Sequence, residues 1–279
     1  MRNVLFSMVM LVLASCGKPP PEAPKQLADL SLYLFREFDS EQEELAAGLV
    51  NLHDWMLKQD LDLDPSELAV TLPLLKGADL GPYSIPEGAD VDRQVPIGLP
   101  GLSNYSSDEH VQVFLDTNQV CIESGTTKFA RREFLTDQDC FESGDCDELS
   151  TMTNVYKENP LAKVWYDMYK DYRRVELDEI GTAYIGRTWM EEVFPGEGGN
   201  TSWDQMFSID VLIPGTKNGT TLRYFAMWSS ITVPLIGDDS YAVLVRDGID
   251  EAFRFGEEYL AGEIESCRND RDAPRSDFE

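Results

Sequence analysis

The chain has 279 residues, and its 51 acidic and 23 basic side chains give a formal net charge of -28 at pH 7. Such a charge repels phosphate backbones and anionic lipid headgroups, which argues against a nucleic-acid-binding protein. Hydrophobic residues make up 42% of the chain, which is enough for one large core.

The first sixteen residues carry the features of an export signal. A basic Arg2 precedes an apolar run from Val4 to Leu13, which is too short to span a bilayer. The run ends in Leu13-Ala14-Ser15-Cys16, which resembles the lipobox of bacterial lipoproteins. The resemblance implies that residues 1–15 are a cleaved signal peptide and that Cys16 receives two or three fatty chains, which anchor a protein firmly. The alternative is an uncleaved anchor with a chance cysteine.

Residues 16–26, which begin with this cysteine, are predicted to form a tether. Prolines 19, 20, 21 and 24 favour an extended, solvated backbone that cannot continue a helix. In Gram-negative relatives of such lipoproteins, an aspartate directly after the lipidated cysteine favours retention in the inner membrane. Gly17 occupies that position here. We therefore expect a protein of the bacterial cell envelope, anchored through its acyl chains, with the outer membrane favoured over the inner membrane.

Residues 27–108 are predicted to contain two parts. From Leu27 to Lys58, apolar residues keep helical spacing, and Ser40 with Glu43 fits a capping box. This pattern predicts a helical hairpin or one bent helix. Residues 60–108 are rich in proline, glycine and aspartate and are expected to form an irregular wrap over the body.

Within this wrap, Asp60, Asp62 and Asp64 imitate the start of a calcium-binding loop. Pro65 stands where the sharp turn needs glycine, and Thr71 stands where the bidentate glutamate belongs. We predict no metal at this position.

Residues 109–266 are predicted to form an antiparallel sheet followed by a C-terminal helix. Alternating apolar residues predict short strands near 111–115, 120–122 and 129–135, and longer strands over 162–177, 182–194, 205–213 and 221–233. Turns rich in glycine, proline and asparagine separate the longer strands, which implies a meander.

The last predicted element is an amphipathic helix from about Ser240 to Ile264, capped by Asp238, Asp239 or Ser240. Its apolar stripe comprises Ala242, Val245, Ile249, Phe253, Gly256 and Leu260. An alternative makes residues 241–245 a strand and begins the helix at Asp247. The polar tail 267–279 is expected to be loose.

Four cysteines besides Cys16 would reach an oxidising compartment such as the periplasm, where we expect two disulfides. We favour the pairs Cys140 with Cys146 and Cys121 with Cys267, and the rival pairing joins Cys121 to Cys140. The spacings lack the short cysteine pairs of zinc sites, and neither histidine lies beside a cysteine.

A curved antiparallel sheet that leads through a proline into a long C-terminal helix resembles the helix-grip fold of START-like lipid-binding proteins. The resemblance covers roughly residues 110–264, and the stretch that carries it is Thr221-Leu222-Arg223-Tyr224-Phe225-Ala226-Met227-Trp228, then Ile231-Thr232-Val233-Pro234-Leu235 and the helix. The expected fold class is α+β. The resemblance implies a cavity between sheet and helix that holds a lipid, sterol or other apolar molecule. This chain departs from the usual layout by placing a long helical and loop segment before the strands.

Strand alternation selects the residues expected to line this cavity. We expect them to face inward together on one wall, and they are Arg187, Trp189, Phe207, Ile209, Arg223, Phe225 and Met227.

Two of these candidates are arginines on apolar strand faces, where an unpaired charge is very costly. One hypothesis is that Arg187 or Arg223 binds the anionic head of a bound amphiphile. The interpretation that we prefer is that each pairs with an internal acid such as Asp210 or Glu191, or reaches solvent at the rim.

A catalytic motif is not evident in the sequence. It contains no HExxH, GxSxG or Walker-type phosphate loop, and we interpret its two histidines, His53 and His110, as surface or rim residues. A pair of carboxylates acting as acid and base cannot be located in so acidic a chain. We therefore predict a non-enzymatic lipoprotein without a cofactor, with an interaction or structural role and a protein partner. The alternative is binding or transport of a lipid or other apolar ligand in a helix-grip cavity.

Overall fold

The computed structural model describes residues 22–123, 125–158, 163–233 and 237–264. Its strands are β1 Val70–Thr71, β2 Val95–Ser103, β3 Thr127–Phe134, β4 Glu148–Glu158, β5 Lys163–Leu177, β6 Gly181–Trp189, β7 Phe194–Pro195, β8 Ser202–Pro214 and β9 Thr221–Thr232. Its helices are α1 Leu27–Arg36, α2 Gln42–Met56, α3 Pro65–Leu68, α4 Ser107–Leu115, α5 Gln138–Ser143 and α6 Asp238–Leu260. Short 3-10 turns are η1 Glu37–Asp39, η2 Gly77–Asp79 and η3 Val91–Arg93.

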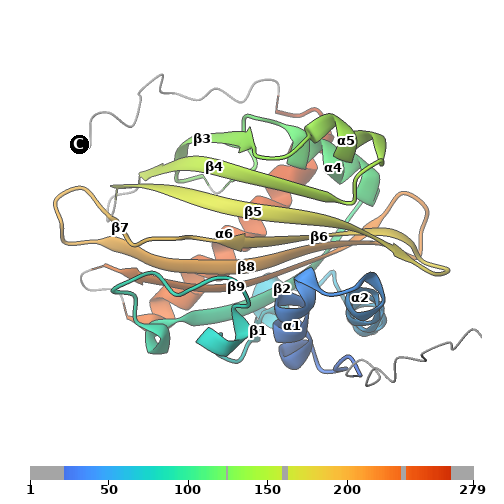
Figure 1. The fold of residues 1–279 in the computed structure, drawn as a ribbon, viewed down its shortest axis with the longest axis horizontal. Coiled ribbons are helices and arrows are strands. Elements are labelled where there is room, and N and C mark those ends of the chain that lie inside the picture. Colours follow the sequence, from blue (N-terminus) through green and yellow to red (C-terminus); the bar gives the residue numbers. More distant parts are fainter. Residues whose placement is uncertain (1–21, 124, 159–162, 234–236, 265–279) are drawn as a thin grey trace, which may run out of the picture.

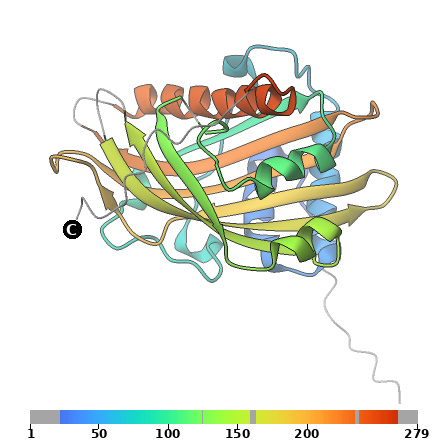
Figure 2. The ribbon, with the colours of Figure 1, turned by 90° about the horizontal axis from the view of Figure 1, so that it is seen from above.

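The strands form one antiparallel sheet in the order β1-β2-β9-β8-β6-β5-β4-β3, with β7 paired to β8. Helix α6 crosses one face of this sheet, and α1 and α2 cover the opposite face (Figure 1). Figure 2 shows the sheet curving toward α6, with α4 beside that helix on the same side. The α+β class, the curved antiparallel sheet and the packed C-terminal helix are therefore confirmed. In the part of the chain that is described, no helix is long and apolar enough to cross a membrane.

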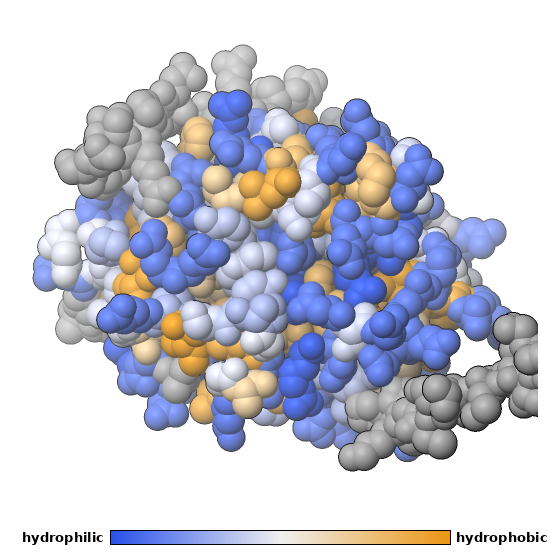
Figure 3. Space-filling view, viewed as in Figure 1, coloured by the Kyte–Doolittle hydropathy of each residue, from blue (hydrophilic) through white to orange (hydrophobic). Residues whose placement is uncertain are grey.

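Helices α1 and α2 bury their apolar stripes against one face of the sheet. The Phe35 ring contacts the rings of Phe207 and Trp228 edge-on, with centroids 6.0 and 5.7 Å apart. Around them, the buried sheet residues are Val175, Leu177, Ala183, Ile185, Ile209, Val211, Ile213, Leu222, Tyr224 and Ala226. The two helices therefore shield an apolar sheet face from water, a gain of about 25 cal/mol for each square ångström of apolar surface. Figure 3 shows that the resulting surface is mostly hydrophilic, with only small hydrophobic patches.

Helix α6 packs on β2 through much of its predicted stripe. Its Tyr241, Val245 and Ile249 are buried against Val95, Ile97 and Leu99, and Phe253 extends the contact. Gly101 leaves room for this last ring, because a Cβ there would lie 2.9 Å from Phe253. The alternative of a strand over residues 241–245 is wrong, since these residues lie inside one continuous helix that begins after Gly237.

Two of the short strands expected from alternation are absent from the described residues. Val111 to Leu115 belong to α4, because Ser106 and Glu109 form a capping box that fixes the helix start, and the buried positions recur at helical spacing. Residues 120–122 form turns. The capping box expected of Ser40 and Glu43 does not form, because the Ser40 hydroxyl donates to Glu37 and α2 begins without a side-chain cap.

The expected irregular wrap contains one long strand, β2, which pairs with β9 along its whole length. Its two prolines, Pro96 and Pro100, are an even number of positions apart, so their backbone nitrogens face the same side of the strand. The carbonyl of Pro96 accepts a hydrogen bond from the Leu72 amide on the side away from β9. The missing N–H groups of both prolines therefore point away from β9, so proline is tolerated near the edge of the sheet.

Candidate functional site

A cavity of about 110 Å³ lies between α6, α4 and the sheet, on the face opposite α1 and α2. Its apolar lining consists of Val113, Phe114, Ile122, Met168, Leu212, Phe225, Ala252 and Phe253. An apolar cavity of about 150 Å³ holds one benzene molecule. The present cavity therefore suits a small molecule and is too small to enclose a lipid acyl chain.

Charged side chains line the same cavity, and the closest pair is Lys170 with Asp210. The Lys170 Nζ donates to Asp210 Oδ2 at 2.5 Å, reaching across β6 where Gly186 pairs with Asp210. A Cβ on Gly186 would lie 2.5 Å from the Lys170 Cε atom, so the glycine makes this reach feasible. Burial lowers the pKa of Lys170, but Asp210 and Tyr172 outweigh it and the net pKa is raised. Lys170 is therefore a buried ammonium at neutral pH.

Arg223 lies between the cavity and α6. Its Nη1 donates to the Phe253 carbonyl at 2.9 Å, and its guanidinium stacks on the Phe253 ring, 4.2 Å from the centroid. The same Nη1 lies 3.6 Å from Oε1 of Glu257. Gly256 permits this approach, because a Cβ there would lie 3.3 Å from the guanidinium. Burial lowers the pKa of Arg223, while Asp210 and Glu257 oppose this effect.

Arg132 is the third cation of the cavity, and its residue is only 4% exposed. Its Nη1 donates to the Phe114 carbonyl at 2.6 Å, and its Nε donates to the Thr153 hydroxyl at 3.4 Å. Both acceptors are neutral, and no carboxylate among the described residues forms an ion pair with it. Its charge is therefore the least compensated of the three.

His110 also lines the cavity and is 2% exposed, so the expectation of a rim position is wrong. Its Nε2 lies 2.7 Å from Ser103 Oγ and 3.9 Å from Glu257 Oε1. Burial, assisted by Arg223, lowers the pKa of His110 to about 3, so its ring is neutral at pH 7. In a nucleophile–base–acid relay the acid holds the other ring nitrogen. Here both groups approach the same nitrogen, so the three residues do not form such a relay.

Arg187, expected to line the cavity, lies on the opposite face of the sheet. Its guanidinium donates to both carboxylate oxygens of Asp39, at 2.9 and 2.7 Å, and to the Tyr83 hydroxyl at 2.7 Å. Its side chain is 2% exposed. The arginine is thus paired with an acid of the same chain, but that acid is Asp39 of η1, whose side chain is 54% exposed, and is neither Asp210 nor Glu191. Arg187 therefore holds the N-terminal segment, which comprises α1, η1 and α2, to the sheet and does not face the cavity.

The other candidates for one cavity wall are also divided between the two faces. Trp189, Phe207 and Ile209 pack beneath the N-terminal helices, whereas Phe225 and Met227 face α6. Ile209 pairs with Ala226, so the two share a face and the neighbouring Phe225 lies on the other. The expectation of a single wall is wrong because alternation fixes faces within one strand, while register fixes them between strands. Among the seven candidates, only Arg223 and Phe225 line the cavity.

Arg132 and Lys170 are not among the residues predicted from sequence. The sequence does contain a pattern that indicates Lys170 as a buried cation. In a strand, Lys170 lies on the same face as Met168 and Tyr172, just as Arg223 lies on the same face as Phe225. Arg132 follows the same rule with Ala130 and Phe134, but its strand is short and half of its residues are charged.

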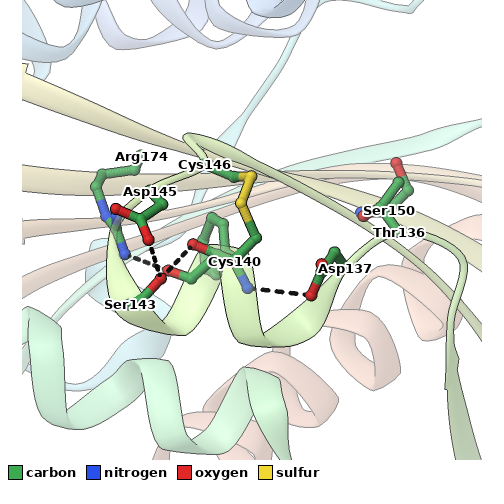
Figure 4. The surroundings of a disulfide bond; sticks show 9 residues. Thr136, Asp137, Cys140, Ser143, Asp145, Cys146, Ser150 and Arg174 are labelled. Atoms are coloured by element: carbon green, nitrogen blue, oxygen red, sulfur yellow. Dashed lines mark hydrogen bonds between the residues drawn. A yellow bond between two sulfur atoms is a disulfide. The ribbon is translucent and has the colours of Figure 1, made fainter.

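The predicted disulfide between Cys140 and Cys146 is confirmed and joins α5 to the chain that follows it (Figure 4). The rival pairing of Cys121 with Cys140 is wrong, because Cys140 is already bonded to Cys146. Cys267 lies outside the described residues, so its bond to Cys121 stays a prediction.

No family model and no curated protein matches the chain. Among solved structures, a STAR-related lipid transfer protein from Xanthomonas axonopodis is 14% identical, with a TM-score of 0.43 over 63% of this chain and 89% of that chain. A START superfamily protein from Mycobacterium smegmatis is 9% identical, with a TM-score of 0.40 over 60% and 98% of the two chains. The Zhui aromatase/cyclase from Streptomyces is 10% identical, with a TM-score of 0.37 over 62% and 94%.

The sheet and the C-terminal helix of this chain resemble those of START-like helix-grip domains. At these identities and TM-scores, the similarities carry no argument about activity or ligand.

Proposed function

We propose that the protein is an exported, lipid-anchored lipoprotein whose folded domain binds a small ligand in the cavity between α6, α4 and the sheet. One observation carries the binding part: the cavity combines an apolar wall with buried charged groups that converge on it from different strands. Ligand sites of proteins typically have this composition, in which apolar surface supplies affinity and a few polar groups fix orientation. The cavity volume selects a ligand much smaller than the lipid expected from the helix-grip resemblance.

Native mass spectrometry of the domain without residues 1–16, followed by organic extraction, tests the binding function. We expect a reproducible small molecule in the native protein that is lost when Arg223 is replaced by glutamine. The matched control is Arg246→Gln, since Arg246 pairs with Asp247 on the outer side of α6 and should not affect the ligand. A clean apo mass for the unmodified domain would contradict ligand binding.

The proposed localisation of the protein depends on the motif Leu13-Ala14-Ser15-Cys16, which lies outside the described residues. We expect cleavage before Cys16 and acylation of that cysteine, and the glycine at position 17 favours the outer membrane. Replacing Cys16 with serine should leave an unprocessed precursor without acyl chains, which mass spectrometry of the membrane fraction would detect. A native protein with an intact Met1 or a bare Cys16 would refute the proposed anchor.

A structural or protein-interaction role is the second candidate. The observation that favours it is the small cavity, in which Lys170 and Asp210 already neutralise each other. In that case the charged groups would serve the packing of α6 on the sheet. A domain that carries no ligand but captures the same protein partner reproducibly would favour this role.

A further inference from the structure

The cations of the cavity are not balanced by the carboxylates that reach it. Arg132, Lys170 and Arg223 line the cavity, and Asp210 compensates Lys170 directly. Glu123 also borders the cavity, but its carboxylate lies 3.4 Å from the ammonium of Lys157. Because the whole chain is strongly acidic, an excess of positive charge in its interior is a local feature that requires a specific explanation.

The contact between Arg223 and Glu257 is loose, in contrast to the pair of Lys170 and Asp210. At 3.6 Å it is longer than a hydrogen bond. Two buried atoms, Arg223 Nε and Glu257 Oε1, make no hydrogen bond within the described part of the chain. A second oxygen of Glu257 accepts from the Asn104 amide at 3.1 Å, which holds the carboxylate in place. Arg223 therefore keeps hydrogen-bonding capacity that Glu257 does not use.

From these contacts we propose that the ligand is a small monocarboxylate with a compact apolar body, and that Glu257 competes with its carboxylate for Arg223. The inference rests on the proposed binding function and specifies its ligand class. Guanidinium groups bind carboxylates with short, charge-assisted hydrogen bonds, and the unused Nε of Arg223 provides such a donor. The rings of Phe225 and Phe253 offer an apolar wall for the rest of the molecule. Glu257 does not line the cavity, so it acts on Arg223 from the α6 side.

Isobutyrate is a suitable probe, because its branched body is small, and isobutyramide has the same shape without the charge. Calorimetric titration of the detergent-solubilised full chain should show binding of isobutyrate and at least tenfold weaker binding of isobutyramide. Glu257→Gln should strengthen isobutyrate binding about tenfold, a usual size for coupling between two binding events. Arg223→Gln should weaken it by at least tenfold.

The matched control is Glu258→Gln, since Glu258 neighbours Glu257 in sequence but pairs with Arg254 on the surface of α6. It should leave isobutyrate affinity within twofold, and a thermal melt of each variant checks the fold. Equal binding of isobutyrate and isobutyramide, or an unchanged affinity in Glu257→Gln, would overturn the inference. A co-purified neutral ligand without isobutyrate binding would overturn the ligand class and leave the binding function intact. Absence of both would overturn both proposals.

Discussion

Replacing Asp39 with alanine is expected to lower the free energy of unfolding by about 3 kcal/mol, the lower end of the range for removing one partner of a buried ion pair, because Arg187 is buried whereas the Asp39 side chain is 54% exposed. The substitution leaves the Arg187 guanidinium, whose side chain is 2% exposed, without its bidentate carboxylate. Asp171, 4.0 Å away, and the Tyr83 hydroxyl still compensate part of the charge, which places the expected value at that lower end. Equilibrium denaturation in urea would measure the change.

The double variant Asp39→Ala with Arg187→Met distinguishes an unpaired buried charge from a simple loss of packing. Methionine can occupy the apolar site between Phe38 and Tyr83 without needing a counter-charge, so the double variant should be more stable than Asp39→Ala alone. Asp54→Ala, at an exposed position on α2, should change stability by no more than about 0.5 kcal/mol. If Asp39→Ala behaved like Asp54→Ala, the ion pair would not hold the N-terminal segment to the sheet.

Four of the longer strands and the three longest helices of the described residues follow from local patterns. Strands β5, β6, β8 and β9 have continuous alternation and glycine-rich turns, and α1, α2 and α6 have clear apolar stripes. Strand β4 was missed because two of its buried positions are Thr151 and Thr153, which interrupt an apolar alternation. Strand β2 was missed because prolines and glycines usually mark loops, and only its place near the sheet edge makes them tolerable.

The candidate site could be predicted only in part, for a physical reason. The sequence shows that Arg187 and Arg223 each lie on an apolar strand face, and the structure places a carboxylate near each of them. Which sheet face each occupies depends on strand register, and register depends on turns and bulges that bring distant segments together, such as the irregularity between Trp203 and Gln205 in β8. The partner Asp39 lies 148 positions from Arg187, so no local pattern could identify it.

The two faces of the sheet therefore differ in the residues that they carry and in the elements that cover them. The face beneath α1 and α2 is largely apolar, and the ion pair of Arg187 with Asp39 helps to hold the N-terminal segment to it, whereas the opposite face carries the charged residues of the cavity. The N-terminal segment covers a sheet face whose apolar residues would otherwise be exposed to water.

Phe35→Ala tests this role of the N-terminal segment and should lower the free energy of unfolding by about 3 to 5 kcal/mol. Phe35 is fully buried, and its ring contacts both Phe207 and Trp228, so truncation leaves a cavity between α1 and the sheet. Phe255→Ala is the matched control, because that ring is only partly buried on α6 and stacks on Arg254, so a loss near 1 kcal/mol is expected. Guanidinium titration monitored by tryptophan fluorescence would measure both variants. A loss for Phe35→Ala no larger than that of the control would mean that α1 adds little to the stability of the sheet. Because folded domains are stable by only about 5 to 15 kcal/mol, the expected loss would be a large share of the total.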